Sequence, residues 1–384
     1  MKQLLNPEMQ ENLLDRGFNR RSFGRVAAMI TAGASLPFYN EAALAQGLSA
    51  MRGPIPADAV RINANENPLG PCDAAVEAMS SVLKKGGRYL YEHTFEFGKV
   101  QADIDGVKPN YVVPYDGSSA PLHQAVIGFC SKDKPFVIAD PGYEAGSRAA
   151  EFIGAKVIRV PLSKDYSHDV KAMAAAHPSP GLIYICNPNN PGGWPTKKSD
   201  IEWLVNNKPA GTMILLDEAY IHLSKEEVSS DLVAADKDVV ILRTFSKLYG
   251  MAGLRAGAAI GRPDLLDKIS PWGAGALPVT GMVGATASLK EKNLVAERRK
   301  IIGDVRNDLF SWFTKKNYKF IPSETNNFMV ATDGGAKKFI DGMFAEKILV
   351  GRIWTSMPKH VRISVGTREE MEKFKVAFEK VIAA

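Results

Sequence analysis

Six short apolar runs, separated by stretches with helical patterning, constrain the fold of this chain most strongly. The runs cover residues 135–139, 155–160, 182–186, 212–216, 239–243 and 256–260. Nearly continuous apolar runs of this length suit strands that are buried on both faces. The segments between them include plausible helices at 120–130, 144–153 and 199–206. This alternation predicts an α/β domain with a mostly parallel sheet sandwiched by helices.

A change of pattern near Pro278 predicts a second, smaller domain. A chain of 384 residues exceeds what one hydrophobic core usually serves. Residues 280–313 have a mostly helical pattern, and residues 317–384 read as short strands and helices, which is typical of an α+β domain. We therefore expect three folded parts: an N-terminal segment over 46–85 that joins the small domain, a large domain over 86–285, and the small C-terminal domain over 286–384.

The N-terminal residues have a pattern of their own. Arg20 and Arg21 precede a modest apolar stretch at 26–36, and Ala43-Leu44-Ala45 has the small residues of a cleavage site. This order resembles a twin-arginine export signal, which implies a signal peptide over 1–45, outside the fold, and a periplasmic protein. The apolar stretch is too short and too rich in Gly and Ala for stable insertion into a membrane. The alternative is an N-terminal arm of a cytoplasmic enzyme.

Net charge and cysteine spacing argue against several kinds of partner. The formal charge of +6 is mild and no long basic run occurs, which argues against nucleic acid and permits an anionic substrate or cofactor. Cys72, Cys130 and Cys186 lack the spacing of metal ligands, so we expect free thiols and no metal site. No GxGxxG motif follows a first strand, which disfavours a dehydrogenase.

A lysine follows the fifth apolar run, at the edge of the predicted sheet where ligands bind. Parallel sheets bind ligands beyond the carboxyl ends of their strands, and Lys247 comes shortly after the run 239–243. Partial burial there lowers the pKa of a lysine and makes its amine available for imine formation. Thr244, Ser246 and Arg255 add hydroxyl and guanidinium donors of the kind that bind a phosphate. By itself, the Ser-Lys pair would also fit a surface turn.

The stretch from Thr244 to Gly257 resembles the lysine motif of class I/II, fold-type I aminotransferases, which use pyridoxal 5′-phosphate (PLP). It is most similar to the histidinol-phosphate aminotransferase branch, and the resemblance runs in order along roughly residues 60–370. The resemblance implies the aspartate aminotransferase fold, with a large PLP-binding domain, a smaller α+β domain, and PLP held as a Schiff base on Lys247. It also implies a homodimer with shared active sites.

The same resemblance implies which residues hold the cofactor phosphate. Gly117 permits an unusual backbone turn, and the N–H groups of Ser118 and Ser119 at a helix start would bind the phosphate, together with the donors around Lys247. The family usually has asparagine where Asp116 stands here. Tyr89 matches a tyrosine that reaches the cofactor phosphate of the neighbouring subunit, although the proline that usually follows is absent.

Four further residues match family contacts to the pyridine ring. Tyr143 would stack on the ring, and Asn190 and Tyr220 would hydrogen-bond its O3′ oxygen. Asp217 would face the ring nitrogen and keep it protonated, which turns the ring into an electron sink. Gly192 replaces the usual threonine of the Asn190 loop, so one side-chain contact is lost there.

The substrate side of the site depends on an arginine near the C-terminus. Arg362 matches the family residue that clamps the α-carboxylate as a bidentate pair. Asn327 and Asn67 match motifs that line the substrate site. Arg352, ten residues before the clamp, only loosely matches the family's phosphate-binding residue, and Trp354 makes the pocket more apolar. We therefore predict an amino acid substrate, aromatic or basic, in preference to histidinol phosphate.

Together these roles predict a transaminase that uses an L-amino acid and a 2-keto acid. Lys247 would move the Cα proton of the substrate as general base and acid, with Asp217 and Tyr220 as the other catalytic residues. Histidinol-phosphate aminotransferase proper and a PLP-dependent oxidase or decarboxylase remain alternatives, because they share the fold and most of these residues. The alternative outside the enzymes is a PLP-carrying binding protein.

Overall fold

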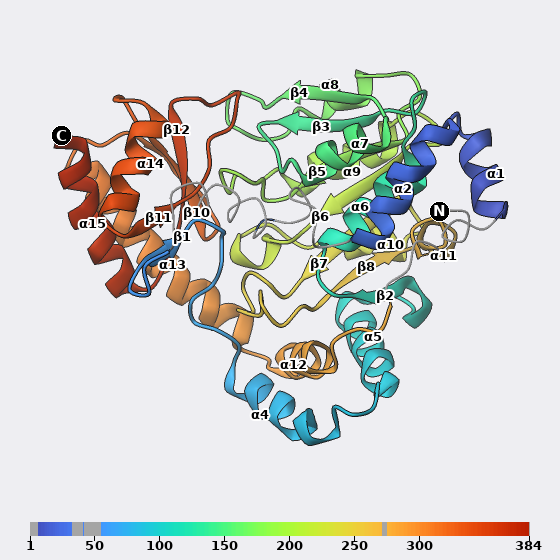
Figure 1. Cartoon of the computed structure of the whole chain (residues 1–384), viewed down its shortest axis with the longest axis horizontal. Helices are drawn as coiled ribbons and strands as arrows, with labels where there is room; N and C mark the ends of the chain where they lie inside the picture. The colour runs from blue at the N-terminus through green and yellow to red at the C-terminus, as the bar shows by residue number, and fades with distance from the viewer. Residues whose placement is uncertain (1–6, 33–40, 42–54, 271–274, 384) are drawn as a thin grey trace.

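The computed structural model describes residues 7–32, 41, 55–270 and 275–383, which form a large and a small domain (Figure 1). The sheet of the large domain has the strand order β2-β8-β7-β6-β5-β3-β4. Its strands are β2 (Val112–Tyr115), β3 (Phe136–Asp140), β4 (Val157–Pro161), β5 (Leu182–Cys186), β6 (Met213–Asp217), β7 (Val239–Thr244) and β8 (Gly257–Gly261). Every residue of β5, β6, β7 and β8 is buried, as continuous apolar runs require.

All six predicted runs form strands of this one sheet, and only β8 runs against its neighbours. The reversal has a local cause. Residues 245–256 contain no crossover helix, so the chain turns back and pairs with β7 in the antiparallel sense. The sequence pattern does not reveal β2, because four residues interrupted by Pro114 give no clear period. The predicted fold class, a mostly parallel sheet within an α/β domain, is confirmed.

Helices surround the large sheet, and α12 packs against α4 and α5 on one side of it (Figure 1). The predicted helices at 120–130, 144–153 and 199–206 correspond to α6, α7 and α9. The helices of this part are α4 (Asp73–Val82), α5 (Tyr91–Asp105), α6 (Ser119–Phe129), α7 (Ala145–Ile153), α8 (Val170–Ala175), α9 (Lys198–Asn207), α10 (Ser230–Ala234), α11 (Pro263–Leu266) and α12 (Val279–Lys290), with 3-10 turns η2 (Leu83–Lys85), η3 (Pro109–Tyr111) and η4 (Ile221–Leu223).

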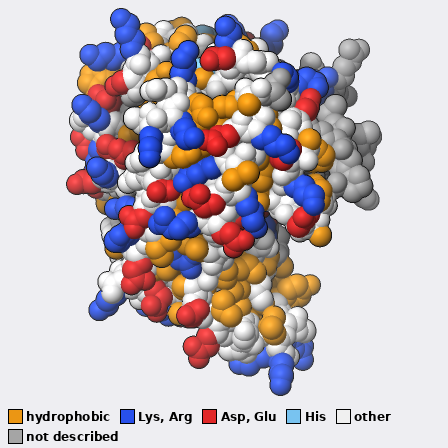
Figure 2. Space-filling model, turned by 90° about the vertical axis from the view of Figure 1, so that its left-hand side faces the viewer, with side chains coloured by type: hydrophobic (Ala, Val, Ile, Leu, Met, Phe, Trp, Pro, Cys, Tyr) orange, Lys and Arg blue, Asp and Glu red, His pale blue; other side chains and the backbone are white. Residues whose placement is uncertain are grey.

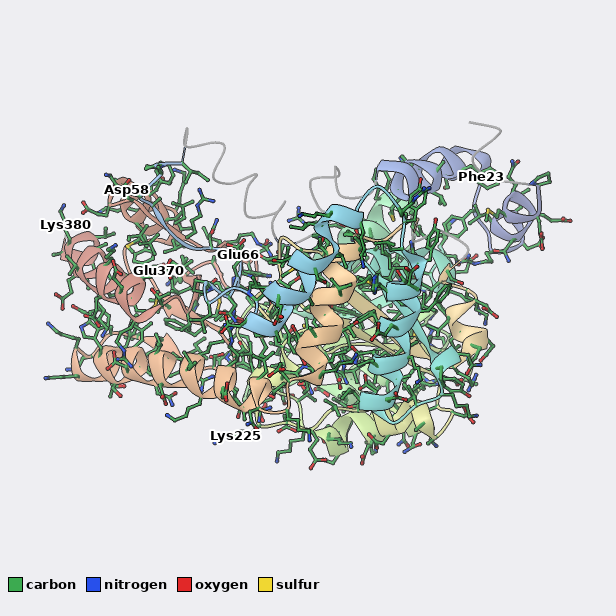
Figure 3. All side chains as sticks on the ribbon, turned by 90° about the horizontal axis from the view of Figure 1, so that it is seen from below. Phe23, Asp58, Glu66, Lys225, Glu370 and Lys380 are labelled. Atoms are coloured by element: carbon green, nitrogen blue, oxygen red, sulfur yellow. The ribbon has the colours of Figure 1, made fainter. Side chains whose placement is uncertain are left out.

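The small domain combines two short sheets with three helices. Its elements are β1 (Val60–Ile62), β9 (Phe320–Ile321), β10 (Asn327–Ala331), β11 (Ile348–Val350), β12 (His360–Ser364), α13 (Leu294–Lys315), α14 (Ala336–Ala345) and α15 (Arg368–Ala383). Strands β12, β10 and β9 pair antiparallel, and β1 joins the domain by pairing parallel with β11. Phe313 lies at the centre of its core, with its ring 5.6 Å from Phe328 and 5.2 Å from Phe378. In Figure 3, the labelled Glu66 lies where the two domains meet.

Two N-terminal helices, α1 (Pro7–Asp15) and α2 (Arg20–Ala32), pack against the large domain. Leu13, Phe18 and Val26 are buried in this contact, and the Arg16 guanidinium donates to the carbonyl of Cys130 at 3.0 Å. The sequence led us to expect the first 45 residues outside the fold. Residues 26–32 of the apolar stretch lie in α2, which contacts α6 and α7. The predicted cleavage site at 43–45 lies outside the described residues, and removal of this segment by cleavage stays a prediction. Among the described helices, none has the length and apolar character needed to cross a membrane.

Candidate active site

Lys247 lies just beyond β7 at the carboxyl edge of the large sheet, and its side chain is buried. Its ammonium donates to the backbone carbonyls of Ala64 at 3.3 Å and Asn65 at 3.1 Å, both in the segment after β1. Burial lowers the pKa of Lys247 to about 8; Glu41 opposes this shift and the positive charge of Arg362 adds to it. The structure therefore holds a primary amine that is partly unprotonated near neutral pH.

A phosphate-sized group of donors lies beside this lysine. Ser119 begins α6, Gly117 has a φ of +114°, and a Cβ at Gly117 would lie 2.5 Å from the Arg255 guanidinium. Only glycine therefore allows the backbone to approach that arginine. The Thr244 hydroxyl donates to the Ser246 hydroxyl at 2.9 Å, so the predicted hydroxyl donors form one cluster. Helix N–H groups, hydroxyls and a guanidinium are the donors that an anionic phosphate requires.

Asp217, the last residue of β6, is buried and holds two hydrogen bonds. The Tyr184 hydroxyl donates to one carboxylate oxygen at 2.8 Å, and the backbone N–H of Ala219 donates to the other at 3.1 Å. Burial raises the pKa of Asp217 to about 6, while these two bonds and the charge of Lys247 oppose the rise. The carboxylate is thus fixed in orientation and suited to hold a protonated ring nitrogen.

Two tyrosines and an asparagine line the same cavity. The Tyr220 hydroxyl accepts a 2.9 Å hydrogen bond from Asn65, and the Tyr220 ring centroid lies 5.5 Å from the Lys247 ammonium. Burial raises the pKa of both Tyr143 and Tyr220, so both phenols stay protonated at neutral pH. The structure therefore brings Tyr143, Asn190 and Tyr220 to the cavity that also holds Asp217 and Lys247.

Arg362, on β12, is fully buried and faces the same region from the small domain. Its guanidinium donates to the Asn190 side-chain oxygen at 2.9 Å and to the Asn63 carbonyl at 2.7 Å. A third hydrogen bond, at 2.6 Å, goes to the carboxylate of Glu41. Although burial alone would raise the pKa of Glu41, Arg352 and Arg362 hold it well below its usual range. A carboxylate is therefore already bound at the predicted carboxylate clamp.

Arg352 binds the same Glu41 carboxylate at 3.0 Å and also pairs with Glu144, at 2.9 and 3.0 Å to its two oxygens. The Trp354 ring lies against both arginines, with its centroid 4.6 Å from the Arg352 and 5.3 Å from the Arg362 guanidinium carbon. Arg352, Arg362, Glu41 and Glu144 are hereafter called the arginine cluster. The sequence did not reveal Glu41 or Glu144; the position of Glu144 directly after Tyr143 is the only local hint.

Three predicted residues lie elsewhere. The Asn67 side chain donates to the Leu248 carbonyl at 2.7 Å, so it supports a loop beside the site. The Asn327 amide donates to the Pro191 carbonyl and thereby holds the loop that carries Asn190. Tyr89 is 70% exposed. It does not line the cavity, and the role that the resemblance implied for it, at the phosphate of a neighbouring subunit, stays a prediction.

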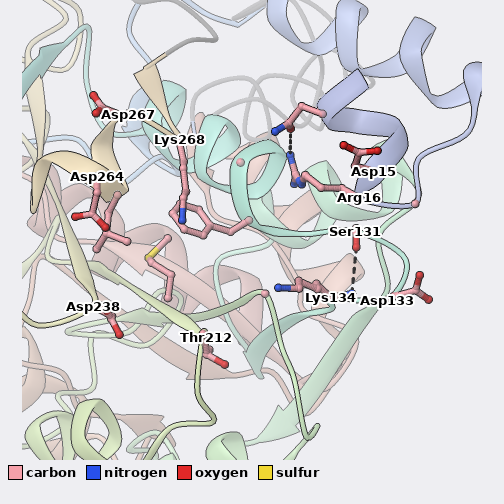
Figure 4. A pocket seen from close by; sticks show the side chains of 18 of the residues that line it. Asp15, Arg16, Ser131, Asp133, Lys134, Thr212, Asp238, Asp264, Asp267 and Lys268 are labelled. Carbon is pink, nitrogen blue, oxygen red and sulfur yellow. Dashed lines mark hydrogen bonds between the residues drawn. The ribbon is translucent and has the colours of Figure 1, made fainter. Parts of the chain in front are cut away.

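The cavity around Lys247 has a volume of about 280 Å³ and is lined by the large domain, by Glu41 and by Ala64 and Glu66 of the segment after β1. A larger hollow, of about 920 Å³, lies at the opposite, amino ends of the strands (Figure 4). Its labelled residues include Asp238 and Thr212, and none of the residues predicted for the active site lines it. In the described part of the chain, no group of three or more His, Cys, Asp or Glu side chains could hold a metal ion.

The cavity fits PLP by the chemistry of its residues. The amine of Lys247 is buried and has a lowered pKa, and Gly117 lets the backbone approach the Arg255 guanidinium beside the hydroxyl cluster. The buried carboxylate of Asp217 is fixed by two hydrogen-bond donors. An arrangement of this kind at the carboxyl edge of such a sheet defines a fold-type I PLP enzyme.

The chain belongs to the family described as aminotransferase class I and II, which matches residues 57–378. It is 29% identical over 337 residues to a histidinol-phosphate aminotransferase of Moorella thermoacetica, covering 85% of this chain and 86% of the relative. It is 30% identical over 322 residues to an aromatic amino acid aminotransferase of Cutibacterium acnes, covering 82% and 90%.

Solved structures agree with this family. A putative histidinol-phosphate aminotransferase from Erwinia carotovora atroseptica superposes with a TM-score of 0.81 at 28% identity, over 84% of this chain and 96% of that one. The histidinol-phosphate aminotransferase of Sinorhizobium meliloti, solved with pyridoxal-5′-phosphate, gives 0.78 at 25% identity, over 88% and 94%. The predicted fold, enzyme class and cofactor are thereby confirmed: this is a PLP-dependent aminotransferase.

Proposed function

We propose that the enzyme transfers the amino group between an L-amino acid with an aromatic or basic side chain and a 2-keto acid. The observation that carries the proposal is the Glu41 carboxylate bound to Arg362 at 2.6 Å and to Arg352 at 3.0 Å. A carboxylate thus fits the clamp, as the α-carboxylate of an amino acid must. The flat apolar face of Trp354 beside the clamp supports an aromatic side chain or the stem of a basic one.

The residues of the site have separable roles in this reaction. Bound PLP supplies an aldehyde that links to the substrate amine and a ring that draws electrons from the substrate Cα. Lys247 Nζ, whose lowered pKa of about 8 leaves part of it unprotonated near neutral pH, takes the proton from Cα and returns it at the end of the cycle. Arg362 and Asn190, which donate to the Glu41 carboxylate at 2.6 and 3.3 Å, would fix the substrate carboxylate in the same way and so set which bond at Cα faces Lys247.

Three other side chains hold the ring for this proton transfer. Asp217, oriented by Tyr184, would bind the ring nitrogen in its protonated form. Tyr220, oriented by Asn65, would donate to a ring oxygen. Tyr143 closes the cavity beside them, which limits the entry of water to the reacting carbon.

A panel of amino acids tests the proposal. The PLP-loaded enzyme is mixed with each L-amino acid and with L-histidinol phosphate, and the loss of cofactor absorbance and the keto acid are measured. Fastest conversion of an aromatic or basic amino acid supports the proposal, and fastest conversion of histidinol phosphate contradicts it. Oxygen uptake or carbon dioxide release would identify an oxidase or decarboxylase, and no spectral change with any compound would identify a binding protein.

We also propose a homodimer with shared active sites. Exposed apolar side chains gather in the lower part of Figure 2, where Figure 1 places α4. On α4, α5 and the turns between them, Leu83 is 64%, Tyr89 70%, Tyr91 53% and Phe95 75% exposed. An apolar patch of this kind supports a protein contact. Sedimentation of Phe95→Glu tests it: a monomer is expected, and an unchanged dimer would contradict the use of this face.

Export through the twin-arginine route is the remaining proposal. It rests on Arg20 and Arg21 ahead of an apolar stretch and on the small residues at 43–45. Replacing both arginines with lysine keeps the charge and removes the guanidinium pair. Retention of the variant in the cytoplasmic fraction is expected, and an unchanged distribution of the protein would rule out this route.

A further inference from the structure

We infer that Glu144 cancels one of the two positive charges of Arg352 and Arg362, so that the arginine cluster without Glu41 carries one positive unit and selects a singly charged carboxylate over a doubly charged phosphate. The inference rests on the proposed amino acid substrate and names the residue that excludes phosphorylated ones. Glu144 lies directly after the ring-stacking Tyr143, and its carboxylate grips one nitrogen of Arg352 with both oxygens. The structure assigns it no other hydrogen bond through its carboxylate within the described residues.

The charges of the cluster can be counted from its contacts. Arg352 and Arg362 contribute two positive charges, and Glu144 cancels one of them. The remaining unit matches the single negative charge of the Glu41 carboxylate that both arginines bind. A ligand in the place of Glu41 therefore meets a site that is neutralised by one negative charge. A phosphate monoester carries close to two negative charges above pH 7, because its second pKa is near 6.

Because the two arginines are buried, the balance of charge in the arginine cluster has a large effect on the energy of binding an anion. The side chain of Arg362 is fully buried and that of Arg352 is 5% exposed, so neither charge is well solvated. Trp354 covers both guanidiniums with an apolar ring. An uncompensated charge in such a place is costly, whereas a matched pair is tolerated. The side chain of Glu144 is 22% exposed, so its influence on a second ligand charge is partly screened and moderate in size.

Glu144 also belongs to a contact between the two domains, and the test has to separate these two roles. The Ser356 hydroxyl donates to Asp140 at 2.6 Å and the Trp354 indole donates to the Gly142 carbonyl at 3.0 Å, two contacts that precede the Glu144 pair along the same loop. A purely structural role for Glu144 would change the binding of every anion alike. A charge-setting role would change the ratio between a phosphate and a carboxylate.

The experiment measures the dissociation constants of methyl phosphate and acetate for the full-length, PLP-loaded enzyme at pH 8, by calorimetric titration. Glu41 competes with both anions and therefore cancels from the ratio. For Glu144→Gln, the affinity for methyl phosphate relative to acetate is expected to rise about tenfold, equivalent to about 1.4 kcal/mol. Glu144→Asp keeps the charge and Ser356→Ala breaks only the neighbouring contact, so both should leave the ratio within about twofold.

The outcomes separate this inference from the proposed function. An unchanged ratio in Glu144→Gln, or a loss of affinity shared equally by both anions, overturns the charge-setting role. A tenfold change in the same ratio in Ser356→Ala would overturn it too, because that variant alters no charge. Anion binding is read without turnover, so the result stands even where the amino acid panel shows that the proposed substrate class is wrong.

Discussion

Replacing Tyr184 with phenylalanine removes one hydroxyl and leaves the rest of the side chain in place. The ring packs on Phe136 at 5.9 Å between centroids, and phenylalanine keeps this contact. The lost hydroxyl is the donor of the 2.8 Å hydrogen bond to the buried carboxylate of Asp217. The N–H of Ala219 then remains as the hydrogen-bond donor recorded at that carboxylate. The substitution therefore changes the electrostatics of one group with little effect on packing.

The expected change in the pKa of Asp217 follows from the strength of a hydrogen bond to a charged group. Such a bond contributes about 1.5–3 kcal/mol, and one pKa unit corresponds to about 1.4 kcal/mol. The pKa of Asp217, about 6 in the native protein, should therefore rise by about 1–2 units in the variant. At pH 7.5 the ionised fraction of Asp217 would fall from nearly complete to between about a quarter and three quarters.

The assay is the affinity for PLP as a function of pH. Asp217 has to be ionised to hold a protonated ring nitrogen, so affinity falls as the pH drops through its pKa. We expect this fall near pH 6 in the native enzyme and about 1–2 units higher in Tyr184→Phe. An analogue with carbon in place of the ring nitrogen is the control, because it should show no difference between the two proteins. Coincident profiles for PLP itself would refute the reasoning.

Linkage gives a second readout in the enzyme without cofactor. Folding raises the pKa of Asp217 from 3.8 to about 6, so between these pH values the native state binds more protons than the unfolded state. The contribution of this group to the free energy of unfolding is therefore lost as the pH rises from about 3.8 to about 6. In the variant this loss should continue about 1–2 units further. The variant should therefore lose stability relative to the native enzyme at pH 8 and lose much less at pH 5, as measured by thermal unfolding. An equal loss at both pH values would contradict the assigned cause.

Three further substitutions test the remaining roles. Lys247→Ala should lower turnover by at least about a thousandfold, because no other lysine of the described residues lines the cavity, and stopped-flow absorbance measures this. Arg362→Gln should reduce kcat/KM for amino acids by a factor that corresponds to a loss of about 2–5 kcal/mol of transition-state stabilisation, because it removes one partner of a buried ion pair. Its effect on PLP affinity should be smaller. Glu41→Gln should tighten amino acid binding, since its carboxylate competes for the clamp, and should move the pH midpoint of PLP capture below about 8, since Glu41 raises the pKa of Lys247. Unchanged steady-state kinetics in either of the last two variants would argue against the assigned contact.

The fold was predictable because its signals are local. Strands β5, β6 and β7 are nearly continuous apolar runs, and each ends at or just before a polar residue at the edge where ligands bind: Asn187, Asp217 and Thr244. Residues grouped within a few positions of a strand end, such as Asp217, Tyr220 and Lys247, therefore came together as expected. The reversal of β8 was not evident, because direction depends on the geometry of the connection and not on the composition of the strand.

The rest of the site depends on contacts between distant residues, which one sequence does not reveal. Glu41, Glu144 and Arg352 meet only because β12 and the segment before it fold against the large domain. Tyr184 reads as one more apolar residue of β5, and its hydroxyl acquires a role only through the register that pairs β5 with β6. Asn67 and Asn327 match family motifs, yet their amides are engaged by backbone carbonyls beside the cavity.

The loop that carries Tyr143 is fastened to the small domain at three successive points. Asp140 binds Ser356, Gly142 binds Trp354, and Glu144 binds Arg352. A rotation of one domain relative to the other would therefore move Tyr143 together with the Arg352 guanidinium. Release of the product and movement of Tyr143 away from the cofactor ring would then occur together. A substitution such as Ser356→Ala, which removes one of the three contacts, should speed product release although Ser356 contacts no reacting atom.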